Sequence, residues 1–177
     1  MSDINDVLSS DDVATYTPSD EEYVIVEEGE YPAHIVDLKI INTTIRKTGS
    51  KCEIFKPVYE IASQSPNFAG RTVNSNGVFR YHNPPQEGER QATTGNRYYK
   101  NFLDIVGVSM REDKNPNTGQ ITYSLPKVDK DDLYGIPVMI RVKHRAYEYQ
   151  GKGRTAADGI LVSAWGDGKR LEAEIPF

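Results

Sequence analysis

The sequence predicts a mainly β protein, a five-stranded closed barrel with one helix between its third and fourth strands. Several short segments alternate apolar and polar residues, which is the period of a strand with one buried face. Turns rich in Gly, Pro, Asn and Ser separate these segments, and only one segment has its apolar residues at helical spacing. A chain of 177 residues can bury a core as a single domain. A β-sandwich with one helix is the alternative, because strands have the same period in both folds.

Three strands are expected in the first half of the chain. Residues 34–40 alternate and form the first strand, and residues 43–51 have the composition of a hairpin turn. Residues 52–62 form the second strand, in which Pro57 removes a backbone donor and indicates an edge or a bulge. Residues 72–82 form the third strand.

One helix and two strands are expected in the second half. A long polar loop at residues 83–96 leads to a helix at residues 97–110, whose apolar stripe is typical of a side that faces a core. The last two strands are expected at residues 136–150 and 158–168, with the basic tip GKGR at residues 151–154 between them. Two strand hairpins around a central helix are the arrangement of a barrel of the OB type.

The strand at residues 136–150 has two chemically different faces. One face carries Val138, Ile140 and Val142, which are suited to a core. The other face carries Met139, Arg141, Lys143, Arg145, Tyr147 and Tyr149. Cations can follow the phosphates of a nucleic-acid strand, and tyrosine rings accept stacked bases of any sequence. The alternative is the solvated outer face of an antiparallel sheet, where Lys, Arg and Tyr are common.

Other basic and aromatic residues gather at the two expected hairpin tips and on neighbouring strands. In an OB barrel, the loops between strands 1 and 2 and between strands 4 and 5 border the oligonucleotide groove. The residues predicted to bind nucleic acid are Arg46, Lys47, Lys51, Phe55, Arg80, Tyr81, Arg141, Lys143, Arg145, Tyr147, Tyr149, Lys152, Arg154 and Trp165. Core packing is the alternative for the aromatic residues Phe55, Phe79 and Trp165.

Charge is segregated along the chain, although the formal net charge is only −5. Residues 1–30 hold ten acidic residues and no Lys or Arg, whereas residues 31–170 carry a net charge of +7. An acidic lead can compete with a polyanion for a basic body. The alternative is that acidic tails serve solubility alone.

The sequence contains no catalytic constellation. A phosphate-binding GxxxxGK[ST] loop and a GxGxxG motif are both missing, and His34, His82 and His144 lack metal-ligand spacing. The pair Asp131 and Asp132 is expected in a solvated turn, and the single Cys52 is expected to be buried. We therefore expect a protein that is not an enzyme and that needs no cofactor or metal.

A cytoplasmic location is expected from the same sequence. The first ten residues are polar and acidic and lack the apolar run of a signal peptide, and no segment has the length and apolarity of a membrane span. The cytoplasm would be that of the host if the protein is viral.

Residues 28–166 resemble a family of phage-encoded single-stranded-DNA-binding proteins with OB folds. The resemblance is carried by the segments EGEYPAHIVDL, TGSKCEIFKPVYEI, FAGRTV, NFLDIVGV and DLYGIPVMIRVKHRAYEYQGKGR in this order. It implies a protein that coats single-stranded DNA during replication or recombination. It places Arg141, Lys143, Arg145 and Tyr147 on a binding strand and Lys51 on the neighbouring strand.

The end of the chain is similar to the acidic tip of bacterial single-stranded-DNA-binding proteins, which recruits replication and repair partners. The tip residues are Glu172, Glu174, Ile175, Pro176 and Phe177, and a final strand that ends there is the alternative. Three regions are therefore expected: an acidic segment at residues 1–22, a single-stranded-DNA-binding domain at 23–170 and the tip at 171–177. A phage assembly protein and an RNA-binding OB protein are the alternative functions, and self-association is left open.

Overall fold

Five strands close the barrel by pairing in a ring. The computed structural model describes residues 24–46, 49, 51–82 and 96–172. The barrel strands are β1 (Gly29–Thr44), β2 (Lys51–Ile61), β3 (Thr72–Ser75), β7 (Pro137–Tyr149) and β8 (Lys152–Ala164). The ring runs β1, β7, β8, β3, β2 and back to β1, and only the β3–β8 pairing is parallel. The predicted five-stranded barrel of the OB type is confirmed, and the alternative β-sandwich is excluded.

The barrel interior is filled by the apolar residues that alternate along the strands. Val138, Ile140 and Val142 of β7 are fully buried, as predicted from their period of two. Tyr59 of β2 crosses the interior and lies against Gly159 of β8, where a Cβ atom would be 2.9 Å from the Tyr59 Cδ2 atom. The absent side chain at this position therefore makes room for the tyrosine ring.

The predicted third strand is divided into β3 and a separate strand, β4 (Val78–Tyr81), and both pair with β2. Gly77 lies between them with a φ of 100°, and its N–H donates to the Ser75 Oγ atom at 3.0 Å. This positive φ is accessible to glycine at little cost, so the chain turns here and β4 follows β2 away from β8.

One substantial helix lies between the third and fourth barrel strands, as predicted. It is α3 (Arg97–Val106), and its buried face consists of Tyr99, Phe102, Leu103 and Val106. The sequence predicts this helix to residue 110, but Gly107 ends it with a left-handed φ of 76°.

Two further elements follow α3 in sequence. The strands β5 (Arg111–Lys114) and β6 (Ile121–Ser124) form a separate two-stranded hairpin, where the sequence pattern predicts only a turn and a short extended piece. The aspartates Asp131 and Asp132, expected in a solvated turn, lie in the one-turn helix α4 (Lys130–Leu133), which Asp129 caps through a capping box.

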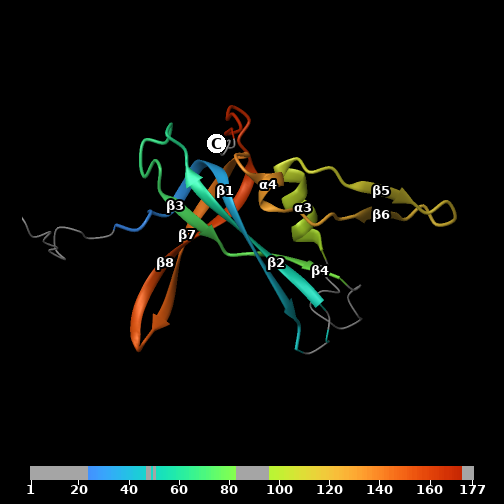
Figure 1. The fold of residues 1–177 in the computed structure, drawn as a ribbon, viewed down its shortest axis with the longest axis horizontal. Coiled ribbons are helices and arrows are strands. Elements are labelled where there is room, and N and C mark those ends of the chain that lie inside the picture. Colours follow the sequence, from blue (N-terminus) through green and yellow to red (C-terminus); the bar gives the residue numbers. More distant parts are fainter. Residues whose placement is uncertain (1–23, 47–48, 50, 83–95, 173–177) are drawn as a thin grey trace, which may run out of the picture.

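Three hairpins extend beyond the barrel (Figure 1). The outer part of β7 and β8, residues 143–158, forms the β7–β8 arm, and the outer part of β1 and β2, residues 39–56, forms the β1–β2 arm, along which β4 runs. These two arms leave the same end of the barrel and diverge, whereas the β5–β6 arm, residues 111–124, points to one side. None of the helices described, α3 or α4, has the length and apolarity needed to cross a membrane.

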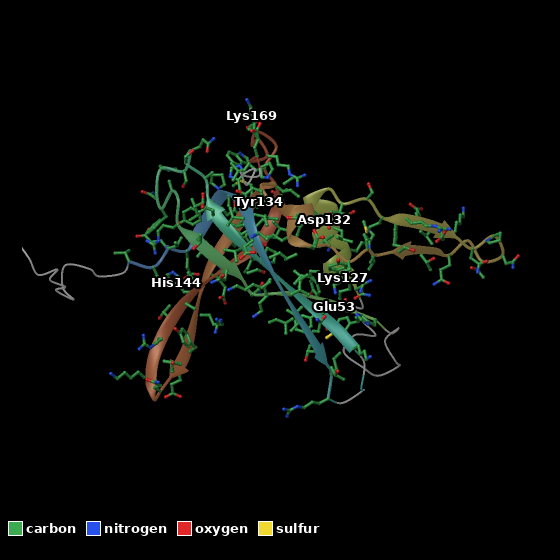
Figure 2. All side chains as sticks on the ribbon, in the orientation of Figure 1. Glu53, Lys127, Asp132, Tyr134, His144 and Lys169 are labelled. Carbon is green, nitrogen blue, oxygen red and sulfur yellow. The ribbon has the colours of Figure 1, made fainter. Side chains whose placement is uncertain are left out.

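The chain after β8 folds back onto the opposite end of the barrel. His34 donates from Nε2 to the Lys169 carbonyl at 2.8 Å, and the Leu171 N–H donates to the Gly135 carbonyl at 2.9 Å. Arg170 donates to the Tyr134 carbonyl at 3.0 Å. Lys169 consequently lies at the end of the molecule away from the tips of the two diverging arms (Figure 2).

Candidate nucleic-acid interface

The predicted binding residues of β7 share one face of the hairpin that β7 forms with β8. The strand register pairs Lys143 with Asp158, and residues that pair across two strands lie on the same face. On this basis one face, here called the outer face, carries Arg141, Lys143, Arg145, Tyr147 and Tyr149 from β7, and Lys152, Arg154, Ala156, Asp158 and Ile160 from β8. The structure therefore brings seven of the predicted residues together.

Cations and rings lie next to each other on this face. The Arg145 Cζ atom is 5.6 Å from the centre of the Tyr147 ring, and the Arg154 Cζ atom is 5.6 Å from the centre of the Tyr149 ring. The side chains remain open to solvent, since Tyr147 is 39% exposed and Tyr149 is 55% exposed. Each pair thus offers a positive charge and an aromatic surface at one place.

Two of the cations are paired with carboxylates of the protein. Arg145 contacts Asp158 at 2.7 Å, and Arg141 contacts Glu30 at 2.7 Å. The hydrogen bond to Asp158 and the charge of that carboxylate raise the pKa of Arg145, so its guanidinium is charged at every physiological pH. Asp158 also fixes the position of this guanidinium beside Tyr147, whereas Lys143 is exposed.

The outer face continues from the β7–β8 arm across the barrel to β4. Asp158 pairs with Asn74 of β3, and Asn74 pairs with Val58 of β2. The same face then passes over Lys56 and Lys39 and over Ile54, Ile41 and Phe79. It ends at the half-buried Tyr81, which pairs with the buried Cys52. The surface is therefore continuous between the two diverging arms.

A pair of aromatic rings lies at the β4 end of the outer face. The rings of Phe79 and Tyr81 are 6.0 Å apart and nearly parallel, and Phe79 is 41% exposed. Binding and core packing are the two expectations for Phe79 from the sequence, and its exposure excludes core packing. Lys39 and Lys56 are not among the residues predicted to bind, and their place on this face follows from the pairing of β1 with β2.

The prediction that Phe55 stacks on bases is wrong. Phe55 is 0% exposed, and its ring lies 5.1 Å from the ring of Tyr99 on α3. Its side chain points into the core because β2 places it on the face opposite to Ile54 and Lys56. The alternative of core packing is correct for this residue.

Arg80 is occupied within the fold. Its Nε and Nη2 atoms donate to the Leu125 carbonyl at 3.1 and 3.0 Å, and Nη1 lies 3.2 Å from the Glu53 carboxylate. Glu53 is 3% exposed and also contacts His82 and Lys127, the latter at 4.0 Å (Figure 2). Arg80 compensates a buried carboxylate, so the structure gives it a packing role and removes it from the interface.

Trp165 is remote from the other predicted residues. It follows β8 at the end opposite to the arm tip, and its ring makes an edge contact with His34 at 5.5 Å. A Cβ atom at Gly168 would lie 2.4 Å from the Trp165 ring, so the indole is enclosed by the segment that folds back. Trp165 therefore belongs to the packing at the far end of the barrel.

The remaining predicted residues lie at tips or at the end of the chain. Arg46 and Lys51 are exposed at the end of the β1–β2 arm, and Glu172 is exposed after the returning segment. Lys47, Glu174, Ile175, Pro176 and Phe177 lie outside the described residues.

Comparisons with protein-family models, curated proteins and solved structures found no match. The candidate interface is thus defined by its own geometry. The exposed Tyr147 and Tyr149 lie beside their arginines at one end, and Phe79 lies beside the half-buried Tyr81 at the other. Within residues 24–46, 49, 51–82 and 96–172, no three His, Cys, Asp or Glu side chains are grouped as metal ligands would be.

Proposed function

We propose that this protein binds single-stranded DNA without sequence specificity and coats it, as the family resemblance implies, in phage replication or recombination. The observation that carries the proposal is the outer face of the β7–β8 hairpin, where seven cationic and aromatic side chains, six of them on the β7–β8 arm, project into solvent.

The chemistry of this face suits an unpaired strand better than a duplex. Stacking on Tyr147 or Tyr149 requires a base whose flat face is free, and the bases of a duplex are stacked on each other. Lys143, Arg145 and Arg154 can contact phosphates, which every sequence presents. A single strand could follow the outer face from these residues to the Phe79 and Tyr81 pair, and OB folds commonly cover about 4–16 nucleotides.

The proposal is tested by the affinity for oligo-dT as a function of salt, measured by fluorescence anisotropy. The affinity is expected to fall steeply as salt rises, because bound phosphates release counterions. Lys143→Ala should weaken binding and reduce the slope of log K against log salt by about 0.7, the value for one contact to a single strand. Lys169→Ala is the matched control, since it removes the same charge at the far end of the molecule (Figure 2).

Three results would contradict the proposal. The first is an affinity that does not depend on salt, and the second is tighter binding to a duplex of the same length. The third is an equal effect of the two lysine substitutions, which would remove the β7–β8 arm from the site. Oligo-U in parallel would reveal an RNA-binding protein if it bound more tightly than oligo-dT.

A further inference from the structure

The β5–β6 arm leaves the body of the protein, and its residues stay exposed although Lys100 of α3 lies over the Tyr123 ring at its base. All eight residues of its two strands are exposed, including Ile121 at 46% and Tyr123 at 41%. Within the described part of the chain these two strands pair only with each other. A two-stranded hairpin in water is marginally stable, so an arm of this kind gains stability when a second layer packs on it.

The two faces of the arm differ in character. The register pairs Glu112 with Tyr123 and Lys114 with Ile121, so these four residues form one face. The opposite face carries Arg111, Asp113, Thr122 and Ser124. The first face combines the two large apolar side chains with one acid and one base, and it is the face suited to packing.

The face that carries Glu112, Lys114, Ile121 and Tyr123 can pair with the same face of a second copy. Two arms can pack with these faces together around a two-fold axis that lies between them, parallel to the sheets and perpendicular to the strands. If the axis passes midway between the Glu112–Tyr123 pair and the Lys114–Ile121 pair, it brings Glu112 of one copy over Lys114 of the other. The same operation brings Tyr123 over Ile121. The contact between Glu112 and Lys114 and the contact between Tyr123 and Ile121 are then each formed twice, as a closed isologous interface requires.

The charge of the arm also favours a second copy of the chain as its partner. Residues 111–124 hold two acids and two bases and are neutral, so two arms do not repel each other. Lys100 of α3 lies at the base of the arm with its Nζ atom 4.6 Å from the centre of the Tyr123 ring, and its hydrogen bond to Asp104 is 3.0 Å long. The ring is therefore held at the base of the arm by a contact that leaves 41% of it exposed.

We propose that the β5–β6 arm is a self-association surface that pairs two copies of this chain face to face. The contact is small beside the roughly 800 Å² per partner of a stable interface, so the dimer is weak and in exchange with the monomer. Because the interface is closed, association stops at two copies.

The test is sedimentation velocity of the full chain over a wide concentration range without nucleic acid. The dimer should form with rising concentration and larger species should not. Glu112→Lys replaces both ion pairs by like-charge contacts and should weaken dimerisation about tenfold, given the usual strength of exposed pairs. Lys114→Glu should do the same. The double variant E112K/K114E restores both ion pairs in swapped order and should restore dimerisation.

Asp113→Lys is the matched control, because it makes the same charge change on the opposite face of the same strand. It should leave dimerisation unchanged, and circular dichroism should show all four variants folded. The proposal is overturned by a monomer at every concentration, by a dimer that Glu112→Lys leaves intact, or by an E112K/K114E variant no better than the single variants.

Discussion

Phe55 and Phe79 show how one residue type acquires two roles from strand parity. They lie on neighbouring paired strands, but Phe55 is fully buried against Tyr99, whereas Phe79 is 41% exposed beside Tyr81. The side chain of Phe79 pairs with Ile54 on the outer face, and that of Phe55 pairs with Val78 on the inner face. Only Phe79 can therefore offer its ring to a ligand.

Substitution of these two residues by alanine should separate stability from binding. Phe55→Ala should lower the free energy of unfolding by about 3–5 kcal/mol, the usual loss for a buried phenylalanine. Phe79→Ala should change it by about 0.5 kcal/mol or less, as at most surface positions, and should weaken oligo-dT binding by about 1–3 kcal/mol if a base stacks there. Urea denaturation and anisotropy measure the two quantities. Normal oligo-dT affinity of Phe79→Ala would confine the interface to the β7–β8 arm.

The buried charge of Glu53 is compensated by basic side chains next to it. Glu53 is almost fully buried, and Arg80, His82 and Lys127 surround its carboxylate. Next to it, burial and the charge of Glu53 raise the pKa of the Cys52 thiol, so the thiolate is disfavoured and this cysteine is unsuited to act as a nucleophile.

Sequence predicts an element well when its two faces differ strongly. In β7 the inner row is Val138, Ile140 and Val142, and the outer row begins with Arg141 and Lys143, so both the strand and its exposed face could be predicted. In the β5–β6 arm every strand residue is exposed. Apolar residues alternate only in β6, through Ile121 and Tyr123, and a run of four residues is too short to identify the hairpin.

The residue pattern of β2 explains why the sequence does not show that Phe55 is buried. Its inner row contains the buried Glu53 beside Phe55, and its outer row contains Ile54 and Val58 beside Lys56. Each row therefore mixes apolar and charged residues. Only the pairing with β1, β3 and β4 distinguishes the two faces, and this pairing depends on residues distant in sequence.

The turn before β7 should be intolerant of any side chain at Gly135. Gly135 has a φ of 81°, and a Cβ atom there would lie 2.4 Å from the Leu171 carbonyl oxygen. Gly135→Ala should therefore destabilise the protein by more than the roughly 1–2 kcal/mol of left-handed backbone strain. Gly151→Ala is the matched control, since Gly151 has a φ of 76° with nothing within 4 Å. Equal losses in urea denaturation would show that the returning segment yields to the added methyl group.

The start of the described chain lies beside the candidate interface. The His144 Nε2 atom donates to the Val26 carbonyl at 2.8 Å, which fixes residues 24–28 at the base of the β7–β8 arm. Residues 1–22 precede this segment in the sequence, lie outside the described residues and hold seven acidic residues.

Removal of residues 1–22 should strengthen the binding of single-stranded DNA. The deletion takes away seven acids and no bases, and it changes the formal net charge from −5 to +2. Association should become faster and the affinity higher at low salt, because the field around the arm becomes more positive. The difference should vanish near 1 M salt, where the screening length is about 3 Å. Stopped-flow fluorescence and anisotropy measure the two effects, and identical rates for both proteins would show that the acidic lead serves another purpose.

The parallel pairing between β3 and β8 affects how the chain is assembled as it is synthesised. Only two residue pairs make this seam, Asn74 with Asp158 and Ser75 with Gly159, and they join positions on opposite sides of the helical region. The first three barrel strands leave the ribosome while the edge of β3 still has unsatisfied backbone groups, and such an edge can pair with another chain. The β7–β8 hairpin, which is translated after these strands, therefore covers the β3 edge and protects the nascent protein from aggregation.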